Sequence, residues 1–168
     1  PSQEDLRKIL MHASENYRIC AVIMAHSGCR PHVLGNYDGS DGLTIGDFPE
    51  MRIDGSKIEF TTVPTMVRVR SGLSKTGRAY FSFLGQEGCD YLKNYLESRI
   101  QEGETLDSKS DIIHPKSWSK KFITTSNLSD GIRSAMRSAG FKNRPYVLRS
   151  FFATQMLLAE SKGTIPHA

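Results

Sequence analysis

The longest uninterrupted apolar run of the chain, ICAVIMA at residues 19–25, places the strongest constraint on its fold. Seven apolar residues are far fewer than the about 20 that a membrane-spanning helix needs, so the sequence predicts no membrane association. The run lies in a segment, about Tyr17 to His26, that we expect to be helical and apolar on nearly all sides. Such a helix has to be buried by other elements. The sequence therefore predicts a buried helix that ends at Gly28, a natural C-terminal cap.

The periodicity of apolar residues divides the rest of the chain into helical and strand-like segments. A first helix begins with a capping-box pattern, Ser2-x-x-Asp5, and continues with apolar residues at helical spacing. After a turn-rich stretch at 35–56, polar and apolar residues alternate as they do in strands. We predict an α+β domain, mainly helical with a small three-stranded antiparallel sheet. Its strands are Lys57–Val63, Met66–Arg70 and Ala79–Leu84, and its later helices are at about 86–100, 129–139 and from Pro145 to before Gly163.

Length and composition are those of a single domain with a polyanionic partner. The 168 residues fit one domain of ordinary size. The three cysteines are an odd and sparse set, which argues against a disulfide framework and indicates a reducing, cytoplasmic location. The net charge of +4 is mild support for binding a polyanion.

The distribution of charge along the chain says more than its total. Residues 38–60 contain six acids against two bases, whereas residues 61–86 contain four bases and no acid. Residues 109–149 contain nine bases against two acids. A basic surface that serves only to keep the protein solvated remains an alternative to a nucleic-acid contact.

Three basic residues in separate segments form a set that is suited to binding a phosphate. Arg30 ends the stretch AHSGCR, Lys75 lies in SKTGR between two predicted strands, and Arg149 lies in RPYVLRSFFATQ at the start of a predicted helix. Two guanidinium groups can clamp the non-bridging oxygens of a phosphodiester, and they stay charged at any working pH. A lysine on a flexible stem can protonate a departing 5′ oxygen. The set therefore suits phosphodiester transesterification, which also requires a hydroxyl nucleophile.

These motifs resemble the catalytic domain of the tyrosine recombinase (phage integrase) family. SGCR at 27–30 is similar to the family's first arginine box, SKTG at 74–77 to its lysine hairpin, and YVLRSFFAT at 146–154 to its second arginine box. Two long strings, PHVLGNYDGSDGLTIGDFPE and RPYVLRSFFATQMLLAESKG, are especially similar to integrases from archaea and their mobile elements. Tyr146 stands where many members have histidine; a tyrosine there can hydrogen-bond a phosphate oxygen.

The resemblance implies a function and a set of catalytic residues. It implies site-specific DNA recombination or integration through a transient 3′-phosphotyrosyl bond, with double-stranded DNA as partner, several protomers on paired sites, and no metal or ATP. Arg30 and Arg149 would hold the scissile phosphate, Lys75 would protonate the leaving oxygen, and Tyr146 would assist at the phosphate. The sequence stops at Ala168, before the expected nucleophile. We therefore expect one catalytic domain that lacks the C-terminal tyrosine segment and the N-terminal DNA-clamping domain, and that is inactive alone.

Further basic residues are candidates for contact with the DNA backbone: Arg68, Arg70, Arg78, Lys120, Lys121, Arg133 and Arg137. Trp118, flanked by lysines, is a candidate for stacking on a base or sugar. Two other functions remain open. A regulator that kept the fold would bind DNA without catalysis, and a metal-dependent phosphodiesterase would use the acids at 38–54. His26, Cys29 and His32 have the spacing of zinc ligands, but no nearby fourth ligand completes a closed site.

Overall fold

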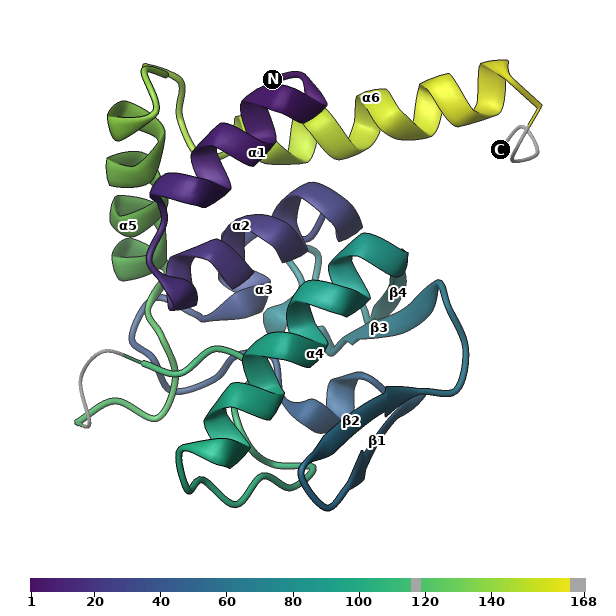
Figure 1. Ribbon diagram of the computed structural model, residues 1–168, viewed down its shortest axis with the longest axis vertical. Coiled ribbons are helices and arrows are strands. Elements are labelled where there is room, and N and C mark those ends of the chain that lie inside the picture. The colour runs from purple at the N-terminus through teal and green to yellow at the C-terminus, as the bar shows by residue number, and fades with distance from the viewer. Residues whose placement is uncertain (116–118, 164–168) are drawn as a thin grey trace.

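The computed structural model describes residues 1–115 and 119–163 of the chain. A long central helix is surrounded by the other helices and by two small antiparallel sheets (Figure 1). The elements in chain order are α1 (Gln3–His12), α2 (Glu15–Ser27), α3 (Pro31–Leu34), the 3-10 turn η1 (Ile45–Asp47), β1 (Met51–Asp54), β2 (Lys57–Phe60), β3 (Thr65–Val69), the 3-10 turn η2 (Ser71–Leu73), β4 (Tyr80–Leu84), α4 (Gln86–Gln101), α5 (Thr125–Ser138) and α6 (Val147–Ser161).

Helix α2 is the centre of the core, as its apolar sequence predicts. All seven residues from Ile19 to Ala25 are almost completely buried. The helix packs against α1, α3, α4, α5, α6 and β4. It ends at Gly28, which has a left-handed backbone (φ 71°) and donates its N–H to the carbonyl of Met24. The predicted burial and the predicted cap are both confirmed.

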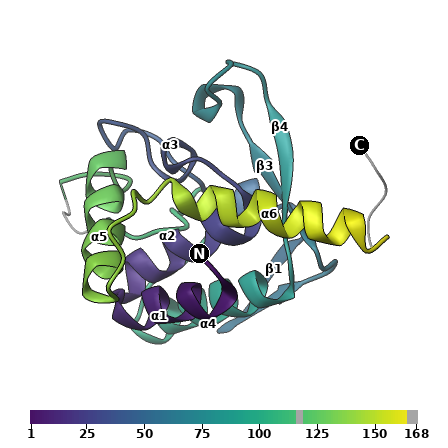
Figure 2. The ribbon, with the colours of Figure 1, turned by 90° about the horizontal axis from the view of Figure 1, so that it is seen from above.

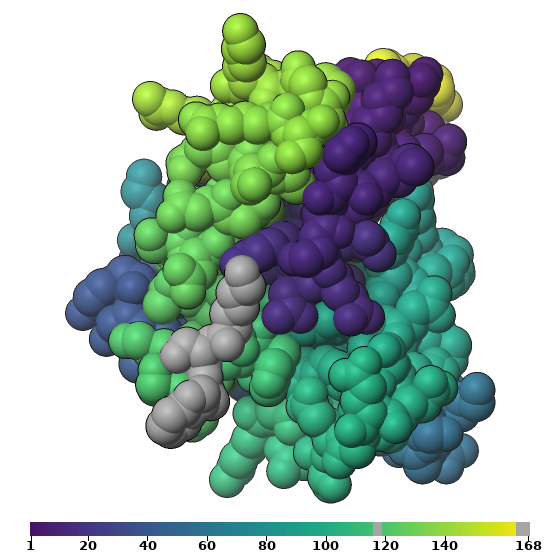
Figure 3. All heavy atoms as spheres, turned by 60° about the vertical axis from the view of Figure 1, so that its left-hand side comes forward, coloured from purple at the N-terminus to yellow at the C-terminus, as the bar shows by residue number. Residues whose placement is uncertain are grey.

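Helix α1 closes one side of the core. Its capping box forms as predicted, since the Asp5 carboxylate accepts from the N–H of Ser2 and the Ser2 hydroxyl accepts from the N–H of Asp5. Leu6, Ile9 and Leu10 are buried against the core. The surface of α1 lies beside that of α5 (Figure 3), so the beginning of the chain and its later part share one hydrophobic interior.

The strands confirm the α+β class but not the single three-stranded sheet. In the described residues, β1 pairs only with β2, and β3 pairs only with β4. Strand β1 was not predicted, because it lies in the turn-rich segment among several glycines. Gly55 (φ 58°) forms the turn between β1 and β2. The prediction that Lys57–Val63 joins the later strands was therefore wrong, because a hairpin partner directly before it satisfies its backbone hydrogen bonds.

The later helices and their connection complete the domain. Helix α4 packs against α2 and β2, and its Arg99 is buried between the carboxylates of Glu104 and Asp111. Arg99 also donates to the backbone carbonyls of Asp111 and Ile112. These bonds fix the polar connection after α4 to the helix. None of the helices formed by the described residues is both long and apolar enough to span a bilayer.

Two elements project from this body. The β3–β4 hairpin extends away from the helices, and α6 crosses beside its base (Figure 2). Helix α6 packs against α2 through its first half, with Leu148 and Phe151 buried. The end of α2, the start of α6 and the hairpin therefore meet at one place on the surface.

Candidate functional site

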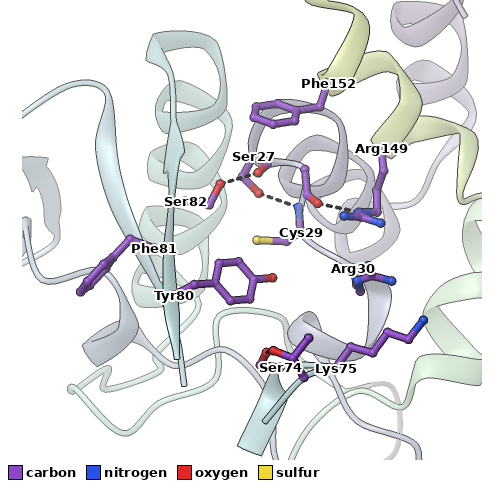
Figure 4. A pocket seen from close by; sticks show the side chains of 12 residues that line it. Ser27, Cys29, Arg30, Ser74, Lys75, Tyr80, Phe81, Ser82, Arg149 and Phe152 are labelled. Atoms are coloured by element: carbon purple, nitrogen blue, oxygen red, sulfur yellow. Dashed lines mark hydrogen bonds between the residues drawn. The ribbon is translucent and has the colours of Figure 1, made fainter. Parts of the chain in front are cut away.

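A surface pocket of about 350 Å³ lies where α2, α6 and the hairpin meet. Arg30, Lys75 and Arg149 all line it, although they come from three segments far apart in the chain. Figure 4 shows the guanidinium groups of Arg30 and Arg149 on the same side of this pocket. The structure thus brings together the three residues that the motifs singled out.

The end of α2 sets the position of Arg30. The left-handed Gly28 turns the chain out of the helix, and the buried Cys29 anchors the next residue in the core. Arg30 then has extended backbone and precedes Pro31, the first residue of α3. Its side chain is left partly exposed at the pocket. A helix end followed directly by a helix start is a rigid support for one guanidinium group.

Gly28 also connects Arg30 to Arg149. A β-carbon at Gly28 would lie 2.4 Å from a ring carbon of Phe152 on α6, so the close approach of the two helices requires glycine there. The carbonyl of Gly28 accepts a hydrogen bond of 2.6 Å from Nε of Arg149. This bond orients the guanidinium group and leaves the N–H groups of its two terminal nitrogens for other acceptors, of which the Tyr146 hydroxyl takes one.

Tyr146 lies outside the pocket lining but contacts Arg149. The phenol oxygen accepts a hydrogen bond from Nη1 of Arg149, and the guanidinium carbon lies 5.0 Å from the centre of the ring. The Tyr146 side chain is 51% exposed. In this conformation the tyrosine orients the arginine, whereas the predicted contact of Tyr146 with a phosphate remains a prediction.

Lys75 enters the pocket from the hairpin. It follows the 3-10 turn η2, and its neighbours Ser74 and Thr76 hydrogen-bond to each other at 3.2 Å. The Lys75 side chain is exposed, and Gly77 behind it has a left-handed backbone (φ 72°). The lysine is thus presented on a turn at the tip of a projecting hairpin.

The pocket has an excess of positive charge. No acidic residue is among the described residues that line it, and within residues 1–115 and 119–163 no carboxylate pairs with Arg30, Lys75 or Arg149. Burial raises the pKa of the Cys29 thiol to about 11, so it is neutral at physiological pH. Three cations without counter-ions around one open pocket form a site for an anion.

Arg70, one of the predicted DNA contacts, is engaged within the protein. Its guanidinium group is held by the carboxylates of Asp41 and Asp47 and by the carbonyl of Gly42. The hydrogen bonds that Arg70 donates to Asp41 raise the pKa of the guanidinium group above its ordinary value. Because its donors are used and its charge is compensated, Arg70 anchors the start of the hairpin loop to the acidic turn, and its contact with DNA remains a prediction.

The other predicted contacts fall into two groups. Arg68, Arg78 and Arg137 are exposed and have no ion-pair partner in the described part of the chain. Arg133 pairs with Asp130 at 2.6 Å, which lowers its availability to DNA. Lys120 donates to the backbone carbonyl of Asp38, and Lys121 lies over the ring of Phe122. Both lysines are exposed and pair with no carboxylate in the described part of the chain.

The structure disfavours the metal-dependent alternatives. Asp41 and Asp47, two of the acids at 38–54, are engaged by Arg70. His26, Cys29 and His32 do not gather, and no three histidine, cysteine or acidic side chains form a metal-binding group among the described residues. Trp118 lies outside the described residues.

Sequence analysis missed the role of Tyr80. The motifs did not include this residue, whose side chain lines the pocket. Strand alternation was the available signal, because Tyr80, Ser82 and the buried Leu84 share one face of β4. Ser82 on that face donates to the carbonyl of Ser27, which joins the hairpin to the end of α2.

Comparison with known proteins supports the fold. No protein-family model matches the chain, and no curated protein is similar to it in sequence. Among solved structures, the chain is similar to the crystal structure of XerA recombinase, with a TM-score of 0.64 and 22% sequence identity over 94% of this chain. The match covers 50% of the XerA chain, so this chain spans half the length of that protein. The chain therefore has the fold of a recombinase.

Proposed function

We propose that this chain is the catalytic domain of a tyrosine-type site-specific DNA recombinase, as the archaeal integrase motifs imply. The observation that carries the proposal is the meeting of Arg30, Lys75 and Arg149 at one open pocket without acidic partners. The likeness in fold to a recombinase supports it independently of those residues.

The proposed chemistry follows from the positions of the side chains. Arg30 and Arg149 hold the non-bridging oxygens of the scissile phosphate and stabilise the extra negative charge of the transition state. Lys75 lies on the hairpin side of the pocket and gives its proton to the departing 5′ oxygen. Tyr146 orients Arg149 and adds a hydroxyl beside the phosphate. The reaction also requires a tyrosine nucleophile, a role that we assign to no residue of this chain, and several protomers assemble on double-stranded DNA.

The experiment compares the binding of inorganic phosphate with that of orthovanadate, a tetrahedral anion that reaches the five-coordinate geometry of the transition state when it takes up a further oxygen ligand. A catalytic pocket binds vanadate more tightly than phosphate because it complements the transition state. We expect R30A and R149A each to weaken the binding of both anions by roughly tenfold or more, because each variant loses a charged hydrogen-bond donor. R7A removes an exposed arginine of α1 and serves as the control.

A second function, a DNA-binding module without catalysis, makes the opposite prediction. Its favouring observation is that Arg68, Arg78 and Arg137 are exposed outside the pocket. If vanadate binds no better than phosphate, and R30A and R149A bind duplex DNA as the wild type does, the pocket is not catalytic and this second function replaces the first.

A further inference from the structure

Tyr80 is placed to take part in the binding of the anion. It is the first residue of β4 and pairs with Val69 across the hairpin, so its position is fixed by the sheet. Its ring reaches into the pocket from the strand side, with the hydroxyl directed toward Cys29 and Arg30 (Figure 4). The side chain is 39% exposed. A phenol that lines a cationic pocket without filling it leaves its oxygen accessible to a ligand.

The Tyr80 hydroxyl has an unused donor. Within the described residues it makes no hydrogen bond, and its exposure leaves the O–H open to a ligand. Its neighbours supply none, since Cys29 is a neutral thiol and Arg30 and Arg149 can only donate. A bound anion would supply the hydrogen-bond acceptor that the side chains around Tyr80 lack.

The protonation state of Tyr80 matches this role. Burial raises the pKa of the phenol, the nearby Cys29 adds to the rise, and the positive charges of Arg149 and Arg30 oppose it. The net result is a pKa above the ordinary value of 10.0, so the phenol keeps its proton at neutral pH. A protonated phenol is a hydrogen-bond donor and a poor nucleophile.

We propose that the Tyr80 hydroxyl is a third donor to the phosphate held by Arg30 and Arg149, contacting a non-bridging oxygen from the hairpin side. This inference rests on the proposed function, because it requires a phosphate between the two arginines. It gives the hairpin a second role: besides presenting Lys75 in its loop, the hairpin closes the phosphate site with a neutral donor at the strand end next to that loop. Three donors from the junction of α2 and α3, from α6 and from β4 would then enclose one tetrahedral group from three directions.

The test removes one oxygen atom from the protein. Y80F deletes the hydroxyl and keeps the ring, and Y37F deletes the same atom from a tyrosine that is 78% exposed on a turn. Inorganic phosphate is titrated into each variant and followed by nuclear magnetic resonance. We expect Y80F to bind phosphate roughly tenfold more weakly, the lower end of the effect of one hydrogen bond to a charged group, and Y37F to bind as the wild type does.

A second measurement separates contact from a structural effect. The ring ¹³Cζ resonance of Tyr80, identified by its loss in Y80F, is followed against pH with and without saturating phosphate. A bound anion disfavours the phenolate, so phosphate should move the titration midpoint of Tyr80 upward in the wild type but not in R30A.

The outcomes distinguish the two proposals. If R30A and R149A lose phosphate while Y80F binds normally and the Tyr80 midpoint does not move, the Tyr80 contact is wrong and the arginine site stands. If R30A and R149A bind phosphate normally, the proposed function fails and the Tyr80 inference fails with it.

Discussion

At the scale of single residues, Gly28 determines how the two arginines are held. Its left-handed backbone ends α2, its missing side chain admits Phe152, and its carbonyl orients Arg149. Sequence analysis predicted the cap from the glycine after an apolar helix. It could not predict the contact with Phe152, because nothing local in the sequence specifies which distant helix packs against a helix end.

The variant G28A is expected to lose both stability and phosphate binding. An alanine in the left-handed region costs about 1–2 kcal/mol, and the overlap with Phe152 adds about 1–3 kcal/mol by displacing α6. G55A is the matched control, since Gly55 has a similar φ of 58° and no atom within 4 Å of an added β-carbon. Urea unfolding and phosphate titration should show the larger loss of stability, and the only loss of binding, in G28A. Equal effects in both variants would mean that the packing of Phe152 does not position Arg149.

The three cysteines are a second test at this scale. Cys20, Cys29 and Cys89 are each at most 1% exposed, and burial raises the pKa of all three thiols. Because the thiolate is the reactive form, we expect a thiol reagent at neutral pH to label none of them before the protein unfolds. Labelling of Cys29 in the folded protein, slowed by bound phosphate, would show that the pocket opens further than the structure does.

At the scale of elements, local sequence patterns predicted the helices, but they did not predict which strands pair with each other. The helix at 86–100 was predicted within one residue of α4, because its apolar stripe is long and regular. The strands were recognised, but their partners were not. The sequence of a short strand shows only that polar and apolar residues alternate, and this does not specify the partner strand. Strand β1 was not recognised because it lies in a segment rich in glycines and acids. The candidate site was predicted from motifs for its arginines and lysine, whereas Tyr80 became visible only when the hairpin was placed against α2.

The attachment of the hairpin to the acidic turn depends on Arg70. R70A leaves the buried Asp47 without its partner, and we expect it to lose about 2 kcal/mol of unfolding free energy. This is below the about 3–5 kcal/mol of a fully buried pair, since the Arg70 side chain is 37% exposed. Thermal unfolding measures the loss, and R70K, which keeps the charge but not the planar fork, should recover only part of it. An unchanged melting temperature in R70A would show that the turn holds the hairpin without this ion pair.

The same cluster predicts a dependence of stability on pH. Burial alone would raise the pKa of Asp41, but hydrogen bonds from Arg70 and from the N–H of Gly42 hold it below the ordinary 3.8. A carboxylate whose pKa is lower in the folded state stabilises the protein above its unfolded pKa, and this stabilisation is lost as pH falls through the folded value. We expect the wild type to lose stability below about pH 4 more steeply than D41N. Parallel stability curves for the two proteins would contradict the role of Asp41.

At the scale of the whole molecule, the basic side chains fall into two groups: those paired with carboxylates and those without such a partner. Arg70, Arg99 and Arg133 are paired with carboxylates inside or along the domain. The arginines and lysine of the pocket, together with Arg68, Arg78 and Arg137, have no such partner in the described residues. The net charge of +4 therefore understates the charge available to a polyanion, because many of the acids are used within the fold.

Arg68 and Arg70 allow a direct comparison of an unpaired arginine with a paired one. They are two residues apart, yet Arg68 is exposed on β3 and Arg70 is bound by Asp41 and Asp47. Each phosphate contact releases about 0.9 of a counter-ion from duplex DNA, so the loss of one contact lowers the slope of log affinity against log salt concentration by about one unit. We expect R68A to weaken duplex binding and to lower this slope by about one, with no change in melting temperature. R70A should lower the melting temperature and, measured well below it, leave the slope unchanged. The reverse result would place the DNA on the side of the hairpin that carries the acidic turn, and it would require that Arg70 exchange its carboxylates for phosphates on binding.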